Sequence, residues 1–319
     1  MANKNLTNAK KAKNDEFYTQ FSDIQKEIEA YLEYNPDVFR GKVVYCNCDD
    51  PFESNFFRYF VLNFNKLGLK QLITTSYKPS PVANTQLGLF GDDKTLTKSK
   101  GRPKINANKF IINEVHDIDG DGEFNLKDIA KQLKVNKHNE WMPLEGDGDF
   151  RSEESIDLLK QSDIVVTNPP FSLFREYLKQ LVDQDKKFLI IGSMNATKYA
   201  NIFPLIKENK IWLGTKSMGV DMLFDIPKEY ADFLVREKKE GSAYRIVDGV
   251  VKGRTQAVWF TNLDHGRRHQ PLPLMREAEI NKFTKKKSFE RYDNYDAIEV
   301  PSVKHIPSDH KGMMGVPIS

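Results

Sequence analysis

An amide, two prolines and an aromatic ring follow one another at Asn168-Pro169-Pro170-Phe171, directly after a short apolar run. The two prolines restrict the backbone, because each fixes its own φ angle and biases the residue before it towards an extended conformation. The segment therefore offers a side-chain carbonyl from Asn168, a directed backbone carbonyl from Pro169 and a flat ring from Phe171. Two acceptors beside a stacking surface suit a planar amine, such as the exocyclic amino group of a purine.

The chemistry that this set favours is alkylation of that amino nitrogen. The nitrogen is a poor nucleophile, because its lone pair is delocalised into the ring. Two acceptors on its hydrogens favour a pyramidal nitrogen, and they stabilise the positive charge that develops as a methyl group arrives. A methyl donor held in line supplies the rest of the acceleration. In the structural alternative, Asn168 merely caps a helix that starts near residue 172, and the prolines end a strand.

The elements that must position this segment alternate along the chain. Apolar periodicity predicts helices over 21–34, 54–64, 125–133, 153–161, 172–183 and 201–209. It predicts strands over 42–48, 71–76, 109–115, 163–167, 186–193, 210–214, 220–226, 243–247 and 256–262. Residues 78–108 are rich in Pro, Ser, Asn, Gly and Lys, so we expect a long surface loop there. The alternation favours a doubly wound α/β sheet, in which ligands lie outside the carboxyl ends of the strands.

Composition limits the class of protein further. The chain has 319 residues, 39% of them hydrophobic, which is enough for one large or two moderate cores. It has no run of 18 apolar residues, and its first residues are polar and lysine-rich, so we expect neither a membrane span nor a secretory signal. Its two cysteines lie one residue apart, a spacing that disfavours a mutual disulfide and fits an intracellular location. The net charge of +3 does not by itself require nucleic acid.

Asn-Pro-Pro-Phe at a strand end resembles the catalytic motif of S-adenosylmethionine-dependent amino-methyltransferases. The wider chain resembles the EcoRI-type adenine-specific DNA methyltransferases over nearly its whole length outside 78–145. The stretches that carry this resemblance include "KNDEFYTQFSDI" (13–24), "KVVYCNCDDPFESNFFRYF" (42–60), "GDGDFRSEESIDLLKQSDIVVTNPPFSLF" (146–174), "KENKIWLG" (207–214), "WFTNLDH" (259–265) and "YDNYDAIEV" (292–300).

The resemblance implies an α/β fold with a Rossmann-like, doubly wound mixed sheet. Residues 1–214 would form the catalytic domain with an insertion at 78–150, and residues 215–319 would form a target-recognition region. Similar enzymes continue beyond the final "MMGVPIS", so we expect this region to be truncated at its C-terminus.

The implied reaction is methyl transfer from S-adenosylmethionine to N6 of a flipped adenine in duplex DNA. The implied setting is restriction–modification or phage self-protection, in the cytoplasm of a bacterial or phage-infected cell, with a cognate restriction endonuclease as a possible partner. Two alternatives remain open: an RNA adenine-N6 methyltransferase, and a DNA-binding homologue that has lost turnover.

The resemblance also assigns roles to residues. Asn168 and Pro169 would hold the target amino group, Pro170 would stiffen the turn, and Phe171 would stack on the flipped base. The expected cofactor-binding residues are Phe17, Tyr18, Thr19, Asn47, Cys48, Asp49, Asp50, Asp149 and Phe150. Asp49-Asp50 and "GDGDF" (146–150) also fit ordinary solvated turns.

The chain departs from the family pattern at two places. The loop after the first strand contains no glycine, although glycine allows close approach of the backbone to a cofactor. The end of the second strand, 73–77, carries no carboxylate for the ribose hydroxyls, so the ribose partner is left unassigned.

Residues 117–128 match a calcium-binding loop. Its expected ligands, which include the backbone carbonyl of Glu123, are Asp117, Asp119, Asp121, Glu123 and Asp128. The alternative is an acidic, glycine-bearing turn without an ion. A structural Ca²⁺ is the favoured interpretation, with no part in catalysis.

Two basic stretches are candidates for contacts with DNA. Residues 94–109 hold six basic and no acidic residues, and Lys100, Arg102 and Lys104 lie at their centre. An arginine between Gly and Pro can enter an A·T-rich minor groove, although a loop making nonspecific phosphate contacts, or one that is merely solvated, fits as well. Arg267 and Arg268 lie in the region where the family places target recognition.

Overall fold

The structure is a computed structural model, which describes residues 18–48, 54–76, 107–117, 138–217, 219–226, 228–271, 274–283, 290–291, 297–300 and 305–315. The chain forms two compact units, residues 1–267 and residues 268–319. Within these described ranges, no helix is both long enough and apolar enough to cross a membrane.

The main sheet lies in the first unit, and the described residues contribute eight strands to it in the order β5-β4-β3-β2-β6-β7-β12-β8. The strands are β2 (Val43–Cys46), β3 (Gln71–Thr75), β4 (Asn108–Ile112), β5 (Glu140–Pro143), β6 (Ile164–Thr167), β7 (Lys187–Ser193), β8 (Trp212–Leu213) and β12 (Ala257–Thr261). The four central strands, β3, β2, β6 and β7, are parallel, and the remaining pairs are antiparallel. The expected mixed α/β sheet is therefore confirmed.

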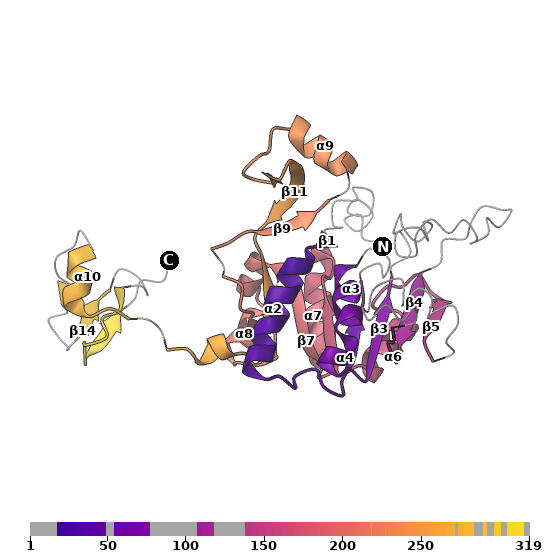
Figure 1. Cartoon of the computed structure of the whole chain (residues 1–319). Helices are drawn as coiled ribbons and strands as arrows, with labels where there is room; N and C mark the ends of the chain where they lie inside the picture. Colours follow the sequence, from indigo (N-terminus) through magenta and orange to yellow (C-terminus); the bar gives the residue numbers. More distant parts are fainter. Residues whose placement is uncertain are drawn as a thin grey trace. The chain divides into compact units, whose positions relative to one another are not determined.

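Helices cover both faces of this sheet (Figure 1). They are α2 (Phe21–Tyr34), α3 (Asn55–Leu62), α4 (Phe64–Leu67), α6 (Glu153–Gln161), α7 (Phe174–Asp183) and α8 (Phe203–Lys207), with short 3-10 turns η2 (Phe171–Leu173) and η3 (Met194–Lys198). Successive strand residues point to opposite faces, so each strand serves two cores. In β2, Val44 and Cys46 join the apolar cluster under α2 and α3, and Val43 and Tyr45 join the cluster under α6 and α7. We call these clusters the α2-side core and the α7-side core.

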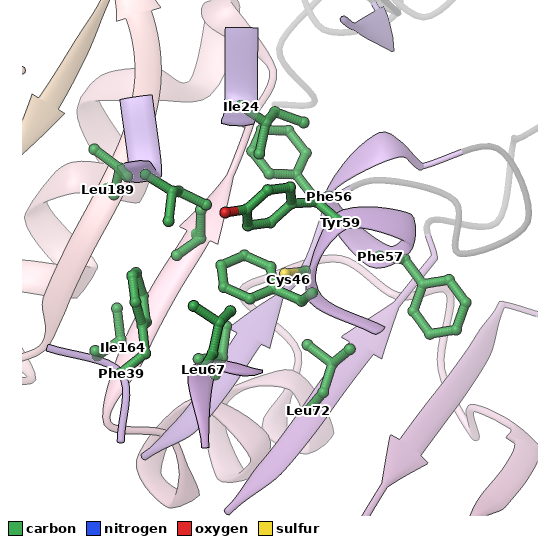
Figure 2. Close-up of a cluster of buried hydrophobic side chains, with 14 of the residues drawn as sticks. Ile24, Phe39, Cys46, Phe56, Phe57, Tyr59, Leu67, Leu72, Ile164 and Leu189 are labelled. Carbon is green, nitrogen blue, oxygen red and sulfur yellow. The ribbon is translucent and has the colours of Figure 1, made fainter. Parts of the chain in front are cut away.

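Aromatic rings fill much of the α2-side core (Figure 2). Phe56, Phe57 and Tyr59 of α3 belong to this cluster together with Cys46 of β2 and Leu72 of β3. The side chain of Phe56 meets Trp259 of β12 edge-on, with ring centroids 6.0 Å apart. Aromatic side chains bury large apolar areas, so this cluster fixes α3 firmly against the strands that precede and follow it.

A smaller sheet in the first unit has the strand order β1-β9-β11-β10. Its strands are β1 (Tyr18–Thr19), β9 (Met222–Asp225), β10 (Tyr244–Val247) and β11 (Val250–Thr255), and α9 (Lys228–Arg236) follows β9. Met222 and Phe224 are fully buried in the α2-side core, which anchors this sheet beside α2. The turn η4 (Gly266–His269) lies at the boundary of the first unit.

In the second unit the structure describes α10 (Glu277–Phe283), β13 (Glu290–Arg291), β14 (Ala297–Glu299) and β15 (Met313–Gly315). The three strands pair in the order β13-β14-β15, and β14 and β15 are parallel. These short elements were not expected from the sequence, because none has a long periodic pattern.

Most predicted elements match the structure, and the main sheet also includes strands from the expected insertion at 78–150 and from the region after residue 214. The stretch 78–150 contributes β4 and β5, which are the two outermost strands of the main sheet on the side of β3. The main sheet also continues past residue 214, because β12 pairs with β7. The predicted loop residues up to 106 and the predicted helix 125–133 lie outside the described residues.

The order in which successive parallel strands are added to the sheet reverses between β2 and β6. From β2 the chain passes through α3 to β3 on one side, and β6 on the other side of β2 leads through α7 to β7. The loops that leave β2 and β6 therefore diverge, and in open α/β sheets ligands bind in the crevice that forms at such a point. The loops concerned begin at Asn47 and Asn168.

Candidate active site

The predicted catalytic segment leaves the main sheet at the carboxyl end of β6. Asn168 is half-buried and Pro169 is buried. The carbonyl of Pro170 accepts a hydrogen bond from the backbone N–H of Leu173 at 2.9 Å, and Pro170 is the N-cap residue of η2. Leu173 is the N-cap residue of α7, so Asn168 caps neither helix, contrary to the structural alternative. The ring of Phe171 is partly buried and packs against the α2-side core.

The loop after β2 makes a sharp turn without glycine. Cys48 has a φ of 67°, in the left-handed region that residues other than glycine rarely adopt. Its side chain is partly buried and packs against the α7-side core. The backbone conformation that a glycine would supply in related loops is thus taken by a cysteine. Asp49 and Asp50, the next two predicted cofactor residues, lie outside the described residues.

Three buried side chains join the ends of β2 and β6. The hydroxyl of Thr167 donates to the backbone carbonyl of Asn47, and the hydroxyl of Tyr177 donates to the side-chain carbonyl of Asn47. We call Asn47, Thr167 and Tyr177 the strand-end clamp. Burial raises the pKa of Tyr177 well above its usual value, so its hydroxyl keeps the proton that it donates. The clamp fixes the β2 turn relative to the loop that begins at Asn168.

The end of β3 is held by hydroxyl groups as well. The hydroxyls of Tyr45 and Thr75 lie 3.0 Å apart and are buried, and burial raises the pKa of Tyr45. The hydroxyl of Ser76 accepts a hydrogen bond from the backbone N–H of Asn108 at 2.8 Å. As the sequence indicated, this strand end offers no carboxylate for a ribose. Its described hydroxyls at positions 75 and 76 already have partners within the protein.

The "GDGDF" segment packs against the end of β3 at Gly148. That residue has a φ of 78°, and a Cβ atom on it would lie 2.0 Å from the carbonyl oxygen of Ser76, so only glycine fits. The carboxylate of Asp149 pairs with the guanidinium of Arg151, at 2.9 Å from Nε and 2.6 Å from Nη2. The ring of Phe150 is buried edge-on against Tyr177, with centroids 5.0 Å apart.

The N-terminal cofactor segment is described from Tyr18 onward. Tyr18 and Thr19 form β1 opposite Asp225 and Phe224, and the carbonyl of Thr19 accepts a hydrogen bond of 2.8 Å from the amide of Asn55. Asn55 is the first residue of α3, the helix that follows β2. The segment is thereby held at the start of α3. Within the described residues the buried hydroxyl of Thr19 has no hydrogen-bond partner. Phe17 lies outside the described residues.

The predicted metal and DNA contacts are described only in part. Asp117 is the one calcium-loop residue among those described; Asp119, Asp121, Glu123 and Asp128 fall outside them, as do Lys100, Arg102 and Lys104. In the part of the chain that the structure describes, no three His, Cys, Asp or Glu residues gather as a metal site. Arg267 donates to the backbone carbonyl of Thr215, and Arg268 follows it in η4.

A buried carboxylate that sequence reasoning missed holds the segment after β8. Glu27 of α2 is 2% exposed, and its carboxylate accepts hydrogen bonds from the backbone N–H groups of Thr215 at 2.7 Å and Lys216 at 3.1 Å. Burial raises the pKa of Glu27, and the bonds from Thr215 and Lys216 oppose that effect. The sequence does contain a signal, because Glu27 lies between Ile24 and Ile28 on the apolar face of its helix.

Thr167 and Tyr177 were also missed. Thr167 looks like the last residue of an apolar strand, and Tyr177 looks like an ordinary member of the apolar face of α7. Their hydroxyls reach Asn47 only because β2 lies beside β6, and the sequence pattern of either element alone does not predict that pairing.

Comparisons with known proteins agree with this geometry. A family model described as "Adenine-specific methyltransferase EcoRI" matches residues 5–319. The Type II methyltransferase M.EcoRI of Escherichia coli is 45% identical over 318 residues, which cover 99% of this chain and 85% of that protein. The Type II methyltransferase M.MpnI of Mycoplasma pneumoniae is 37% identical over 315 residues, covering 98% and 79% of the two chains. No solved structure gave a match.

Proposed function

The chain belongs to the family of the adenine-specific methyltransferase EcoRI, and we propose that it transfers a methyl group from S-adenosylmethionine to N6 of an adenine in duplex DNA. The two relatives named above are Type II methyltransferases, which fits a place in restriction–modification. A cognate endonuclease would be the natural partner in such a system.

The observation that carries this proposal is the place of Asn168-Pro169-Pro170-Phe171 at the carboxyl end of β6, beside the β2 turn. In the proposed mechanism, the side-chain carbonyl of Asn168 and the backbone carbonyl of Pro169 accept the two N6 hydrogens of adenine. These acceptors stabilise the charge that builds on N6 during transfer. Phe171 provides the stacking face for a base that has left the duplex.

The cofactor supplies an activated methyl group on a sulfonium. On this chain, the candidate residues to hold it are Tyr18 and Thr19 of β1 and the turn that starts at Asn47 and Cys48. The unpartnered hydroxyl of Thr19 and the left-handed turn at Cys48 favour this assignment. We propose that Asp149 and Phe150 form a wall of the same site. The carboxylate of Asp149 already pairs with Arg151, and the ring of Phe150 already packs against Tyr177, so these residues would shape the site without forming new polar bonds to the cofactor. Phe17, Asp49 and Asp50 stay predictions from the sequence.

Several finer assignments also stay predictions. These are the contacts of Lys100, Arg102, Lys104, Arg267 and Arg268 with DNA, the recognition role of residues 215–319, and the structural Ca²⁺ at 117–128. Calcium can be tested separately by equilibrium dialysis with ⁴⁵Ca²⁺, comparing the wild type with Asp119→Asn. Binding that the substitution abolishes would support the site.

The experiment that tests the function uses purified protein, methyl-labelled S-adenosylmethionine and a polymer of mixed sequence. Duplex DNA, single-stranded RNA and duplex RNA are compared, and the product is digested to nucleosides. Label in N6-methyldeoxyadenosine from DNA alone is the expected result. Label in N6-methyladenosine from RNA would replace DNA with RNA as the substrate. Cofactor binding without transfer to any polymer would favour a homologue that has lost turnover.

A further inference from the structure

An arginine lies on the first turn of α7, where a cation is electrostatically disfavoured. Arg175 is the second residue of this helix, close to the partial positive charge of the helix N-terminus. Its side chain is exposed, and among the described residues it makes no ion pair. The neighbouring Glu176 pairs instead with Arg151, at 3.1 Å. A residue that goes against the local electrostatic preference is a candidate for a functional role.

The guanidinium of Arg175 is held in place by an aromatic ring. Its central carbon lies 4.0 Å from the centroid of the Tyr199 ring, a cation–π contact. Tyr199 follows η3, the turn that begins directly after β7. Because β6 and β7 are parallel neighbours, this contact bridges the segments that leave their carboxyl ends. The stacked guanidinium keeps its planar edge of N–H donors available for an anion.

The two chain segments that lead to this pair carry no negative charge, and the acidic residues that directly follow them, Glu176 and Glu208, pair with Arg151 and Lys210. Residues 168–175 and 193–207 contain Arg175, Lys198 and Lys207 but no carboxylate, in a protein with 45 acidic residues in 319. Lys198 is exposed and precedes Tyr199. Both segments begin at the edge of the sheet where Asn168 lies. An anionic partner would therefore meet cations, and no repelling carboxylate from these two segments, next to the proposed catalytic loop.

We propose that Arg175, stacked on Tyr199, and Lys198 form a phosphate-binding surface for the duplex DNA whose adenine is methylated. This proposal rests on the proposed function and locates part of the DNA contact that the function requires. Arg175 lies seven residues after Asn168, so a backbone phosphate bound there would anchor the strand near the base that enters the site. Phosphate contacts of this kind set the position of the protein on DNA without reading sequence.

The test measures DNA binding and methyl transfer for Arg175→Gln and Lys198→Gln. The matched control is Lys70→Gln, which removes an exposed cation just before β3, at the opposite end of the parallel strands. We expect Arg175→Gln to weaken DNA binding about tenfold at 0.15 M salt, with a smaller loss for Lys198→Gln. Because each phosphate contact releases a counterion, the slope of log K against log salt should become shallower by about 0.9 for each lost contact. The control should change neither quantity.

Four further readouts separate this role from a structural one. The Kd for S-adenosylmethionine and the rate at saturating DNA should stay within about twofold of wild type, because the phosphate contact contributes mainly to positioning. Arg175→Lys should recover part of the affinity and restore the salt slope, because the charge returns without the planar fork. Tyr199→Leu should weaken binding while leaving that slope unchanged.

The proposal is overturned if Arg175→Gln and Lys70→Gln have the same DNA affinity and salt slope. It is also overturned if the cofactor Kd rises as much as the DNA Kd, since that would indicate a damaged site. Wild-type protein that binds DNA but does not methylate it would contradict the proposed function and leave this surface supported. A wild type that binds no DNA would overturn both.

Discussion

The two ends of the parallel strands in the main sheet, which we call its two edges, carry similar side chains that have different roles. At the edge where the parallel strands begin, side chains bind backbone groups that would otherwise lack partners: Asp163 accepts from Val43 at 2.8 Å, and Asn262 accepts from Phe188 at 2.9 Å. At the opposite edge, the strand-end clamp joins two loops to each other and leaves a residue other than glycine in a left-handed turn.

The difference indicates what each edge contributes. The hydrogen bonds of the first edge complete the sheet, so their loss should lower stability and leave chemistry intact. Those of the second edge set the relative position of the Asn47 turn and the Asn168 loop, so their loss should slow a reaction that depends on alignment. Single substitutions at the first edge should therefore lower stability but not the rate, and those at the second edge should lower mainly the rate.

The largest separation is expected between two asparagines. Asn168→Ala should lower the rate of methyl transfer about 10²–10³-fold, the cost typical of removing one preorganised polar group. Its Tm and its affinity for S-adenosylmethionine should change little. Asn262→Ala should behave in the opposite way, because its amide binds Phe188 and also donates to Lys186 at 2.8 Å. Single-turnover rates and thermal melts of both variants check this, and a slow Asn262→Ala enzyme would contradict a purely structural role for Asn262.

A second contrast concerns two glycines with positive φ. Gly41 precedes β2, and nothing lies within 4 Å of the Cβ atom it would gain, so Gly41→Ala should cost about 1 kcal/mol for the left-handed backbone alone. Gly148→Ala should cost about 3 kcal/mol or more, because its Cβ atom would overlap the carbonyl of Ser76. Urea denaturation measures both. Equal costs would mean that the close contact at Gly148 is absent in solution.

The outer hydrogen bond of the clamp gives a smaller effect. Tyr177→Phe removes only the hydroxyl that donates to Asn47, and the ring stays packed against Phe150. We expect the single-turnover rate to fall about fivefold, and the free energy of unfolding to fall by about 1 kcal/mol, the net value of one hydrogen bond. Tyr59→Phe is a suitable control, since Tyr59 is also buried but lies in the α2-side core. Matching rates for the two variants would exclude a positioning role for Tyr177.

The smallest expected effect is a change in pH dependence. Burial raises the pKa of Glu27 above its ordinary value of 4.5, so the folded protein binds this proton more tightly than the unfolded chain does. The contribution is fully present below pH 4.5 and is lost as the pH rises through the folded pKa. As the pH rises above 4.5, the free energy of unfolding of the wild type should therefore fall relative to that of Glu27→Gln. Denaturation across the pH range measures the shift, and a pH-independent difference would contradict it.

Much of the fold follows from sequence periodicity. The predicted helices 21–34 and 153–161 coincide with α2 and α6, because each has a regular apolar face. The strands that line the site were also predicted, since each is a short, continuous apolar run. The small elements β1, β5 and β13 were missed, because strands of two to four residues leave too little pattern to recognise.

The candidate site was predictable only in part. Asn168 and its neighbours stand out because their residue types are unusual at a strand end. The clamp was not predictable, because Asn47 and Tyr177 are 130 residues apart and meet only through the pairing of β2 with β6. The turn at Cys48 was also beyond sequence reasoning, since cysteine gives no indication of a left-handed backbone.

The catalytic role of the loops after β2 and β6 is tested most directly by two threonines at opposite ends of the parallel strands. Thr167 and Thr261 are both fully buried, and the hydroxyl of each donates to a backbone carbonyl, that of Asn47 and that of Phe188. The measurement is the single-turnover rate of methyl transfer to DNA for Thr167→Val and Thr261→Val, with Tm recorded for each.

We predict that Thr167→Val slows transfer about tenfold with a small loss of Tm, within the ~10²-fold that a misplacement of 1 Å can cost. Thr261→Val should lower Tm further, because its hydroxyl also accepts from Leu263, while the rate stays at the wild-type value. Equal rates for the two variants, or a slower Thr261→Val enzyme, would contradict the assignment of the chemistry to the edge that carries Asn168.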